Sequence, residues 1–194
     1  PELDFVDFGG GFGVPYREGE SRLDPVALGV RLDALLGEWT SRTGRTIEAR
    51  VEPGRYWCAE CGALLGRVHA TKLRGIGVMA GADLGFNVLQ RPVLYEAYHR
   101  VDLVPADRGN RETVSVTWVG NICESGDILG RDRSGPMPMP GDVVRVRDAG
   151  AYGWAMSSSY NARPRAAEIL VGMSGEVGIV RRRETWDDLM RQIP

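Results

Sequence analysis

The stretch Leu3-Asp-Phe-Val-Asp-Phe-Gly-Gly-Gly-Phe-Gly13 begins a strand–loop–helix–strand unit that decides the fold of the first part of the chain. Its apolar first half predicts a short buried strand, and its glycines predict a loop. Asp24 and Pro25 predict the start of a helix that ends near Gly44, and residues 47–51 predict a second strand. Two strands joined through a helix run parallel, as they do in a (β/α)₈ barrel.

From about residue 66 the pattern changes to short apolar stretches separated by turn residues, such as those at 134–141. This spacing predicts an all-β domain, either a sandwich or a Greek-key barrel. We therefore expect an α+β protein with domains at 1–66 and 67–194, the second ending in a short helix capped by Thr185. The expected strands of the second domain are 65–68, 76–79, 101–104, 114–119, 143–146, 169–171 and 177–180.

The composition is that of a chain with a real core and no strong charge. Of 194 residues, 43% are hydrophobic, and the net charge of −2 gives no electrostatic case for binding nucleic acid or an anionic membrane. No apolar run approaches the roughly 18 residues of a membrane span, and the first residues do not form a signal peptide. Three cysteines do not suggest a disulfide framework, so we expect a reducing cytoplasm. Cys58 and Cys61 have the spacing of a zinc or redox pair, but without a second pair we expect no metal site.

Three loops carry residues with chemical potential. After the apolar run at 114–119, Cys123 and Glu124 place a thiol beside a carboxylate, which offers a proton donor and an anion. A lone cysteine is otherwise often a small buried hydrophobe. The glycines of 9–13 allow backbone N–H groups to converge on a phosphate, although such a run is also a simple turn signal. The motif at 52–55, Glu-Pro-Gly-Arg, follows the second strand and has a bland alternative as a Pro-Gly turn with a solvated ion pair.

Taken in order, these motifs resemble those of diaminopimelate decarboxylases, pyridoxal-phosphate enzymes of the alanine-racemase-like fold. The resemblance covers nearly all of the chain. It implies that the chain holds the last βα units of a (β/α)₈ barrel, followed by the β domain. Because a barrel needs eight strands and only about two are present, we expect the C-terminal half of a longer enzyme. The matching segments are Gly-Gly-Gly-Phe at 9–12, Glu-Pro-Gly-Arg at 52–55, 85–99, Cys-Glu-Ser-Gly-Asp at 123–127 and 148–161.

The resemblance also implies how the chain holds pyridoxal 5′-phosphate. Gly10 and Gly11 are expected at the cofactor phosphate, with Gly11 making the closest approach, and Gly54 is expected to add to this phosphate site. Glu52 is expected to pair with the pyridine nitrogen and keep it protonated. Arg55 is expected to bind the phosphate or a substrate carboxylate through its planar guanidinium.

The remaining implied roles concern the substrate. Arg91 and Tyr95 are expected to hold a distal carboxylate; the alternative is a surface helix in which i and i+4 share a face for packing reasons. Tyr152 is expected to contact cofactor phosphate and substrate, and Glu124 the distal ammonium. Cys123 is expected to return a proton to the α-carbon as general acid. In this family the Cys–Glu loop comes from the partner subunit, which implies a homodimer with shared sites.

The expected reaction is decarboxylation of meso-diaminopimelate to L-lysine, in lysine biosynthesis. Two arginines for a distal carboxylate favour this substrate over ornithine or arginine. The family's cofactor-binding lysine and ring-stacking histidine have no counterpart, because Lys72, the only lysine, lies in the predicted β domain. We therefore expect the chain alone to be inactive. Two alternatives are a decarboxylase-like module that acts on another or a carrier-bound amino acid, and a non-catalytic β domain for dimerisation or docking.

Overall fold

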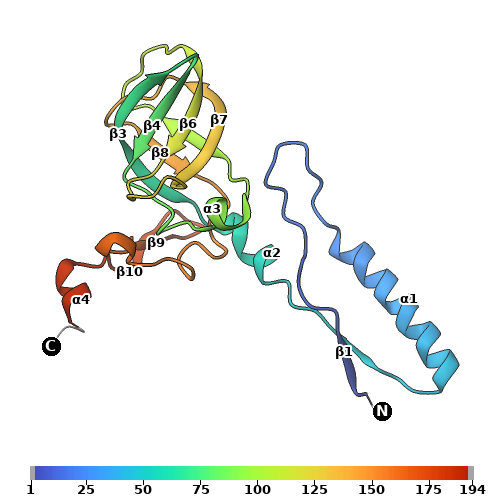
Figure 1. Ribbon diagram of the computed structural model, residues 1–194. Helices are drawn as coiled ribbons and strands as arrows, with labels where there is room; N and C mark the ends of the chain where they lie inside the picture. The colour runs from blue at the N-terminus through green and yellow to red at the C-terminus, as the bar shows by residue number, and fades with distance from the viewer. Residues whose placement is uncertain (1–2, 192–194) are drawn as a thin grey trace.

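The computed structural model describes residues 3–191, which form a curved sheet with an arm of helix and strand at one end and a hairpin below it (Figure 1). The helices are α1 (Pro25–Thr43), α2 (Gly54–Cys58), α3 (Arg91–Tyr95) and α4 (Trp186–Met190), with 3₁₀ turns at Ala59–Cys61 and Tyr160–Ala162. The strands are β1 (Phe5–Asp7), β2 (Glu48–Arg50), β3 (Leu64–Arg74), β4 (Gly77–Ala82), β5 (Val101–Val104), β6 (Thr113–Val119), β7 (Ile128–Pro136), β8 (Val143–Val146), β9 (Glu168–Val171) and β10 (Val177–Arg181).

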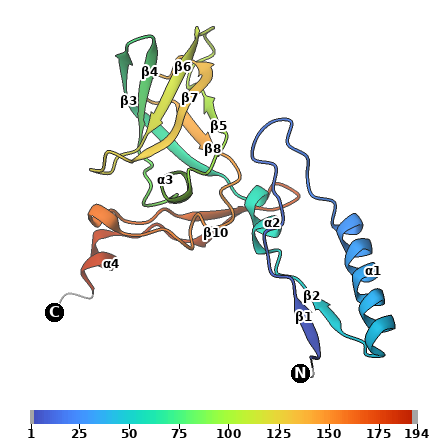
Figure 2. The same cartoon turned by 45° about the vertical axis from the view of Figure 1, so that its right-hand side comes forward.

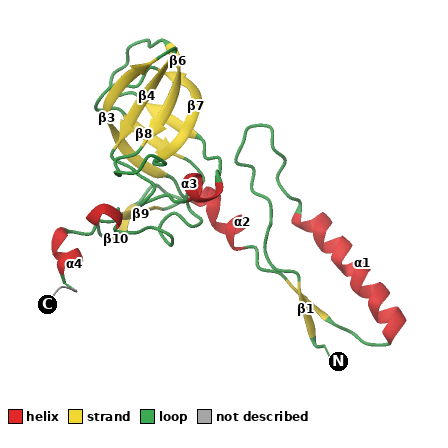
Figure 3. Cartoon of the chain, viewed as in Figure 1, coloured by secondary structure: helices red, strands yellow, loops and turns green. Residues whose placement is uncertain are grey.

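The β1–α1–β2 unit confirms the predicted strand–helix–strand pattern. β1 and β2 pair in parallel. Asp24 caps α1 because its Oδ1 accepts hydrogen bonds from the backbone N–H groups of Val26 and Ala27, at 2.9 and 3.2 Å. Gly44 ends the helix with φ of 68°, in the left-handed region that glycine adopts without strain. This is the longest helix among the described residues, and Figure 3 shows it standing apart from the main sheet.

The expectation that the first strand is buried is wrong for this unit. Phe5 of β1 is exposed, and α1 contains no buried residue. On the apolar face of α1, Val26 is 74% and Val30 66% exposed. The physical reason is that two short strands and one helix have too little surface to enclose each other's apolar side chains.

The main sheet contains six strands in the order β5-β8-β3-β4-β6-β7. All neighbours are antiparallel except β4 and β6, which are parallel. The edge strands β5 and β7 contact each other, so the sheet curls into a nearly closed barrel (Figure 2). Of the two predicted forms, the structure therefore supports the barrel and not the sandwich. The strand β7 was not predicted, and it takes in residues 134–136 of the expected turn, because its Arg, Asp and Ser residues hide the apolar alternation.

The interior of this nearly closed barrel is the core of the molecule. Its side chains come from five of the six strands and from the segment between β4 and α3, so that residues distant in sequence meet. Among residues 3–191, no helix is long and apolar enough to span a membrane. The buried core residues are Val68, Ala80, Ala82, Leu84, Leu89, Val116, Trp118, Leu129, Val144 and Val146.

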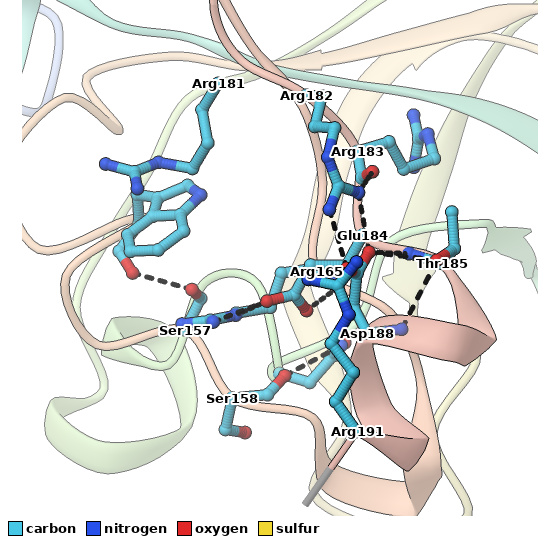
Figure 4. A network of polar contacts seen from close by, with 12 residues as sticks. Ser157, Ser158, Arg165, Arg181, Arg182, Arg183, Glu184, Thr185, Asp188 and Arg191 are labelled. Carbon is cyan, nitrogen blue, oxygen red and sulfur yellow. Dashed lines mark hydrogen bonds and ion pairs between the residues drawn. The ribbon is translucent and has the colours of Figure 1, made fainter.

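The hairpin of β9 and β10 forms a sheet of its own and does not join the barrel strands. The helix α4 follows it and is capped by Thr185, as predicted, through a capping box between Thr185 and Asp188. Figure 4 shows Arg182 on the carboxylate of Asp188, with both contacts at 2.6 Å, and Arg165 on Glu184. The Arg182–Asp188 pair joins α4 to the end of the hairpin, and the Arg165–Glu184 pair joins the segment after the hairpin to the segment before it.

A second, smaller core joins the β1–α1–β2 unit to the barrel. Val14 from the loop after β1, Ala59 from the turn after α2 and Ala151 from the loop after β8 are buried together, with Tyr16 packed against them. Two backbone hydrogen bonds reinforce the junction: the N–H of residue 149 donates to the carbonyl of residue 62 at 2.9 Å, and that of residue 150 to the carbonyl of residue 59 at 3.0 Å. The small side chains at this junction allow the backbones to approach closely.

Candidate active site

A cavity of about 700 Å³ lies beside this smaller core, and we call it the central cavity. Arg55 after β2, Arg91 and Tyr95 on α3, and Tyr152 after β8 all line it. The structure therefore brings together four of the predicted site residues that are separated by up to 97 positions. The other lining residues are Val14, Tyr16, Arg17, Glu20, Ala97, Tyr98 and Met156.

The electrostatic character of the central cavity suits an anionic ligand. Three arginines and one glutamate line it, so its charged side chains carry a net positive charge. Arginine presents a planar fork of N–H donors that matches a carboxylate or a phosphate. A cavity of this size with several convergent polar groups has the dimensions of a small-molecule site.

The glycine loop and the Glu-Pro-Gly-Arg motif lie directly against each other, as a shared phosphate site requires. The N–H of Glu52 donates to the carbonyl of Gly9 at 2.8 Å, and a Cβ atom on Gly10 would come within 2.9 Å of the Glu52 carbonyl oxygen. Gly11 has φ of 81°, and nothing lies within 4 Å of the position where its Cβ would stand. The same is true of the Cβ position on Gly54. The loop is therefore open on the side of Gly11 and Gly54, where side chains would obstruct a phosphate, and these residues fit that group.

Arg91 is buried and is held by a histidine. Its Nη1 donates to Nε2 of His99 at 2.9 Å, and the other ring nitrogen of His99, Nδ1, lies 2.9 Å from the carbonyl oxygen of Arg147. Burial lowers the pKa of His99; the hydrogen bond to Arg147 acts against this, and the charge of Arg91 lowers the pKa further. Arg91 is the buried residue of α3, whereas Tyr95 is 63% exposed, so the two side chains differ in burial although both line the central cavity.

Tyr16 forms one wall of the central cavity beside Arg91. The Arg91 guanidinium lies over the Tyr16 ring at 4.8 Å from its centroid, and the Tyr16 and His99 rings meet edge to face at 5.2 Å. The Tyr16 hydroxyl is buried and has no hydrogen-bond partner among residues 3–191. Burial raises the pKa of Tyr16, so the hydroxyl stays protonated and can donate to an anionic ligand.

Tyr152 stands in a strained backbone conformation at the cavity wall. Its φ is 64°, in the left-handed region that few non-glycine residues adopt. Such strain persists where the surroundings impose it, and it is concentrated at functional sites. The preceding Gly150 packs closely against the turn after α2, which fixes the start of the loop that carries Tyr152.

Cys123 and Glu124 are not brought to the central cavity. Both are exposed, in the loop between β6 and β7. Asp127, which is buried, shapes this loop because its carboxylate accepts the backbone N–H groups of Phe86 at 2.7 Å and Ile122 at 2.8 Å. Burial raises the pKa of Asp127, and these two hydrogen bonds oppose the rise. Asp127 therefore holds the loop between β6 and β7 in shape, and the Cys123 thiol of this loop is exposed.

Sequence reasoning assigned no role to Tyr16 and His99 beside the central cavity, or to Asp127 in the Cys123 loop. Tyr16 follows the glycine loop after a proline, and Asp127 belongs to the quoted Cys-Glu-Ser-Gly-Asp segment, so position alone marked both. His99 ends the matching segment 85–99, but the sequence does not reveal that α3 turns Arg91 back onto it. The role of His99 becomes clear only in the structure, where both of its ring nitrogens have hydrogen-bond partners.

Comparison with known proteins identifies the family. Residues 23–150 match the model of the pyridoxal-dependent decarboxylases, C-terminal sheet domain, and the chain belongs to this family. It is 42% identical to the diaminopimelate decarboxylase of Methanothermobacter thermautotrophicus and 43% identical to that of Archaeoglobus fulgidus, over 98% of this chain in both cases. It covers 44% and 45% of those two proteins, so it spans less than half of their length.

A solved structure shares the architecture described above. The crystal structure of diaminopimelate decarboxylase from M. jannaschii in complex with L-lysine superposes with a TM-score of 0.88 at 34% sequence identity. The match covers all of this chain and 44% of that one. The curled sheet, the hairpin and the arm of helix and strand therefore have a counterpart in an experimentally determined protein.

Proposed function

We propose that this chain is the C-terminal part of a pyridoxal-phosphate-dependent diaminopimelate decarboxylase, which converts meso-diaminopimelate to L-lysine. The observation that carries the proposal is the convergence of Arg55, Arg91, Tyr95 and Tyr152 on one positively charged cavity. The family supplies the reaction class, and the cavity supplies the preference for a ligand with an additional carboxylate.

We further propose that residues 1–66 complete a (β/α)₈ barrel and that residues 67–194 form the C-terminal β domain. The parallel pairing of β1 and β2 supports this division, because parallel strands belong to sheets covered on both faces. The exposed apolar face of α1 supports a partner for this unit in the N-terminal half of the same enzyme. That half would also supply the lysine that binds the cofactor.

In this proposal Gly10, Gly11 and Gly54 would hold the cofactor phosphate. Glu52 lies two residues after the end of β2, and its carboxylate would hold a proton on the pyridine nitrogen. When bound, pyridoxal phosphate supplies an electron sink for the electron pair that carbon dioxide leaves behind. Arg55 follows Gly54 directly in the chain and lines the central cavity, so it is the residue that would bridge the phosphate and the substrate.

The substrate's distal end is assigned to Arg91, Tyr95 and Glu124. Arg91 is desolvated, and a guanidinium shielded from water binds a carboxylate more strongly than an exposed one. Tyr95 lies one helical turn further along α3 and lines the same cavity. Glu124 would accept the distal ammonium. Ornithine and arginine lack a distal carboxylate and would leave Arg91 without a partner.

Cys123 is proposed to complete the reaction from the partner subunit of a homodimer. After the bond between the α-carbon and the carboxylate breaks, the thiol would transfer its proton to that carbon. Within one chain Cys123 and Glu124 are exposed and do not line the central cavity, which supports their delivery to a second subunit's cavity. Asp127 would hold their loop in shape for that insertion.

The test is a substrate comparison with the full-length protein and added pyridoxal phosphate. Carbon dioxide release and lysine formation are followed with meso-diaminopimelate, L-ornithine and L-arginine. We expect turnover of diaminopimelate and little of the other two. An Arg91→Lys variant should lose the bidentate contact and about 10–100-fold in kcat/KM, since a charge-assisted hydrogen bond contributes roughly 1.5–3 kcal/mol. Faster turnover of ornithine or arginine would contradict the assignment.

A further inference from the structure

His99 is a buried group to which the proposed function gives no role. It is fully buried, and both of its ring nitrogens are within hydrogen-bond distance of a partner. Arginine is only a donor, so Nε2 of His99 must be the acceptor of the Arg91 Nη1 hydrogen bond. The proton of the neutral ring is therefore on Nδ1, which donates it to the carbonyl of Arg147.

The rigidity of this arrangement comes from the main sheet. Val101 of β5 pairs with Val146 of β8, and the N–H of Arg147 donates to the carbonyl of Arg100 at 2.8 Å, so the antiparallel ladder continues beside His99. The acceptor for Nδ1 is thus a main-chain oxygen fixed by the barrel. A side chain locked in this way holds the next group in a single orientation.

Three groups surround the His99 ring from different parts of the chain. Arg91 of α3 approaches Nε2, the backbone oxygen of Arg147 after β8 approaches Nδ1, and the Tyr16 ring packs edge to face. No carboxylate among residues 3–191 bonds either ring nitrogen. Because the neighbours are one cation and neutral groups, the ring remains neutral and keeps Nε2 available as an acceptor.

We propose that His99 is a positioning residue that orients Arg91 toward the substrate carboxylate. The proposal rests on the function assigned above, in which Arg91 binds that carboxylate. By engaging Nη1, His99 leaves the other N–H groups of the guanidinium for the ligand, and Tyr16 supports its face. His99 itself touches no substrate atom. Its effect is on substrates that carry the additional carboxylate.

Two substitutions of His99 test its two ring nitrogens separately, and a third removes both contacts. His99→Asn places an amide where Nδ1 stood, so the contact with Arg147 is kept and the acceptor for Arg91 is lost. His99→Gln places an amide oxygen near the position of Nε2 and restores that acceptor. His99→Phe keeps the ring against Tyr16 and removes both contacts.

The experiment uses the full-length enzyme and two competitive ligands, L-lysine and cadaverine. Lysine retains the carboxylate that decarboxylation of diaminopimelate leaves, and cadaverine has none. We expect His99→Asn and His99→Phe to weaken L-lysine binding and raise KM for diaminopimelate by about 10-fold, with cadaverine binding changed less than about twofold. His99→Gln should restore L-lysine binding. Arg91→Ala/His99→Phe should bind L-lysine no more weakly than Arg91→Ala alone, because His99 acts through Arg91.

The outcomes distinguish this inference from the proposed function. Equal weakening of both ligands, or a double variant with additive losses, would overturn the role of His99 and reduce it to a packing residue. If His99→Phe does not fold, the comparison of His99→Asn with His99→Gln decides the same question. If the wild-type enzyme does not decarboxylate diaminopimelate, the proposed function itself fails. If Arg91→Ala weakens L-lysine and His99→Asn does not, only the inference fails.

Discussion

The main sheet buries its own apolar side chains, whereas the β1–α1–β2 unit exposes most of its own. Val144 and Val146 of β8 are fully buried, but Val26 and Val30 of α1 remain in contact with solvent. Both regions have regular, correctly capped or paired elements. The difference teaches that secondary structure is encoded locally, while burial depends on how much of the domain surrounds an element. The barrel strands enclose a core, whereas no residue of α1 is buried.

The largest expected effect is the loss of the buried carboxylate of Asp142 in the barrel. Asp142 is fully buried and accepts hydrogen bonds from Arg111 at 3.0 Å and from the N–H groups of Ala106 and Met139. Although burial alone would raise the pKa of Asp142, these hydrogen bonds lower it below the ordinary value. Asp142→Ala should lower the free energy of unfolding by about 3–5 kcal/mol, because the largely buried Arg111 loses its buried carboxylate partner and keeps only the exposed Asp107. The N–H groups of Ala106 and Met139 also lose their acceptor.

The matched control is Asp33→Ala on the exposed surface of α1. Urea unfolding of this variant should differ from the wild type by about 0.5 kcal/mol or less. Similar losses for Asp142→Ala and Asp33→Ala would mean that the barrel is not the more independently stabilised region.

The second comparison uses one substitution in both regions. Leu129→Ala removes a buried side chain from the barrel core and should cost about 2–5 kcal/mol through lost burial and the remaining cavity. Leu35→Ala on α1 should cost far less in this chain, because Leu35 is 56% exposed. In the full-length protein the cost of Leu35→Ala should rise toward that of a buried leucine. If the two contexts give the same small cost, α1 does not pack against further chain.

A third prediction concerns pH and the junction between the two regions. Burial lowers the pKa of His99 in the folded state. As the pH falls through about 6.5, His99 therefore binds a proton in the unfolded chain but remains neutral in the folded chain. The stabilisation from neutral His99 is therefore complete above about pH 6.5 and is lost as pH falls below it, by at most roughly 1.4 kcal/mol per pH unit. Unfolding measured between pH 7 and 5 should show this loss in the wild type and not in His99→Phe. Equal slopes in the two proteins would contradict a depressed pKa.

The smallest expected effect lies at the start of α1. Asp24→Ala removes the acceptor for two backbone N–H groups and should cost about 1 kcal/mol of helix stability. The helical circular dichroism signal, followed during heating, should be weaker for Asp24→Ala than for the wild type. Asp24→Ser should retain most of this signal. An unchanged helix in Asp24→Ala would show that neighbouring structure, and not the cap, sets the helix start.

The secondary structure of the β1–α1–β2 unit was predictable from the sequence, because its signals are local. Asp24 and Gly44 mark the two ends of α1 by their own side-chain and backbone chemistry, and the glycine loop is a direct reading of residues 9–13. The barrel strand β7 was not predicted because its polar residues show no apolar alternation. Its strand conformation depends on pairing with β6, which is distant information that a local pattern does not contain. The separate sheet of β9 and β10 was missed for the same reason.

The site was predictable as a set of residues and not as an arrangement. Arg55, Arg91, Tyr95 and Tyr152 were named from motifs, and the fold places all four around one cavity. The contact between Arg91 and His99 depends on His99 lying between α3 and the Arg147 carbonyl after β8, which no spacing in the sequence encodes. The roles of these residues in binding and catalysis stay predictions until they are measured.

The most direct test of the account is complementation between defective subunits of the full-length enzyme. Cys123→Ala subunits keep an intact cavity, and Arg91→Ala subunits keep an intact Cys123 loop. If each site combines the cavity of one subunit with the loop of its partner, a random mixture should recover about a quarter of wild-type activity, because half of the dimers then hold one intact site. As a matched control, mixing Cys123→Ala with Glu124→Ala should recover nothing, since both changes lie in the same loop. Recovery in that control, or no recovery from the first mixture although heterodimers form, would contradict a site shared between subunits.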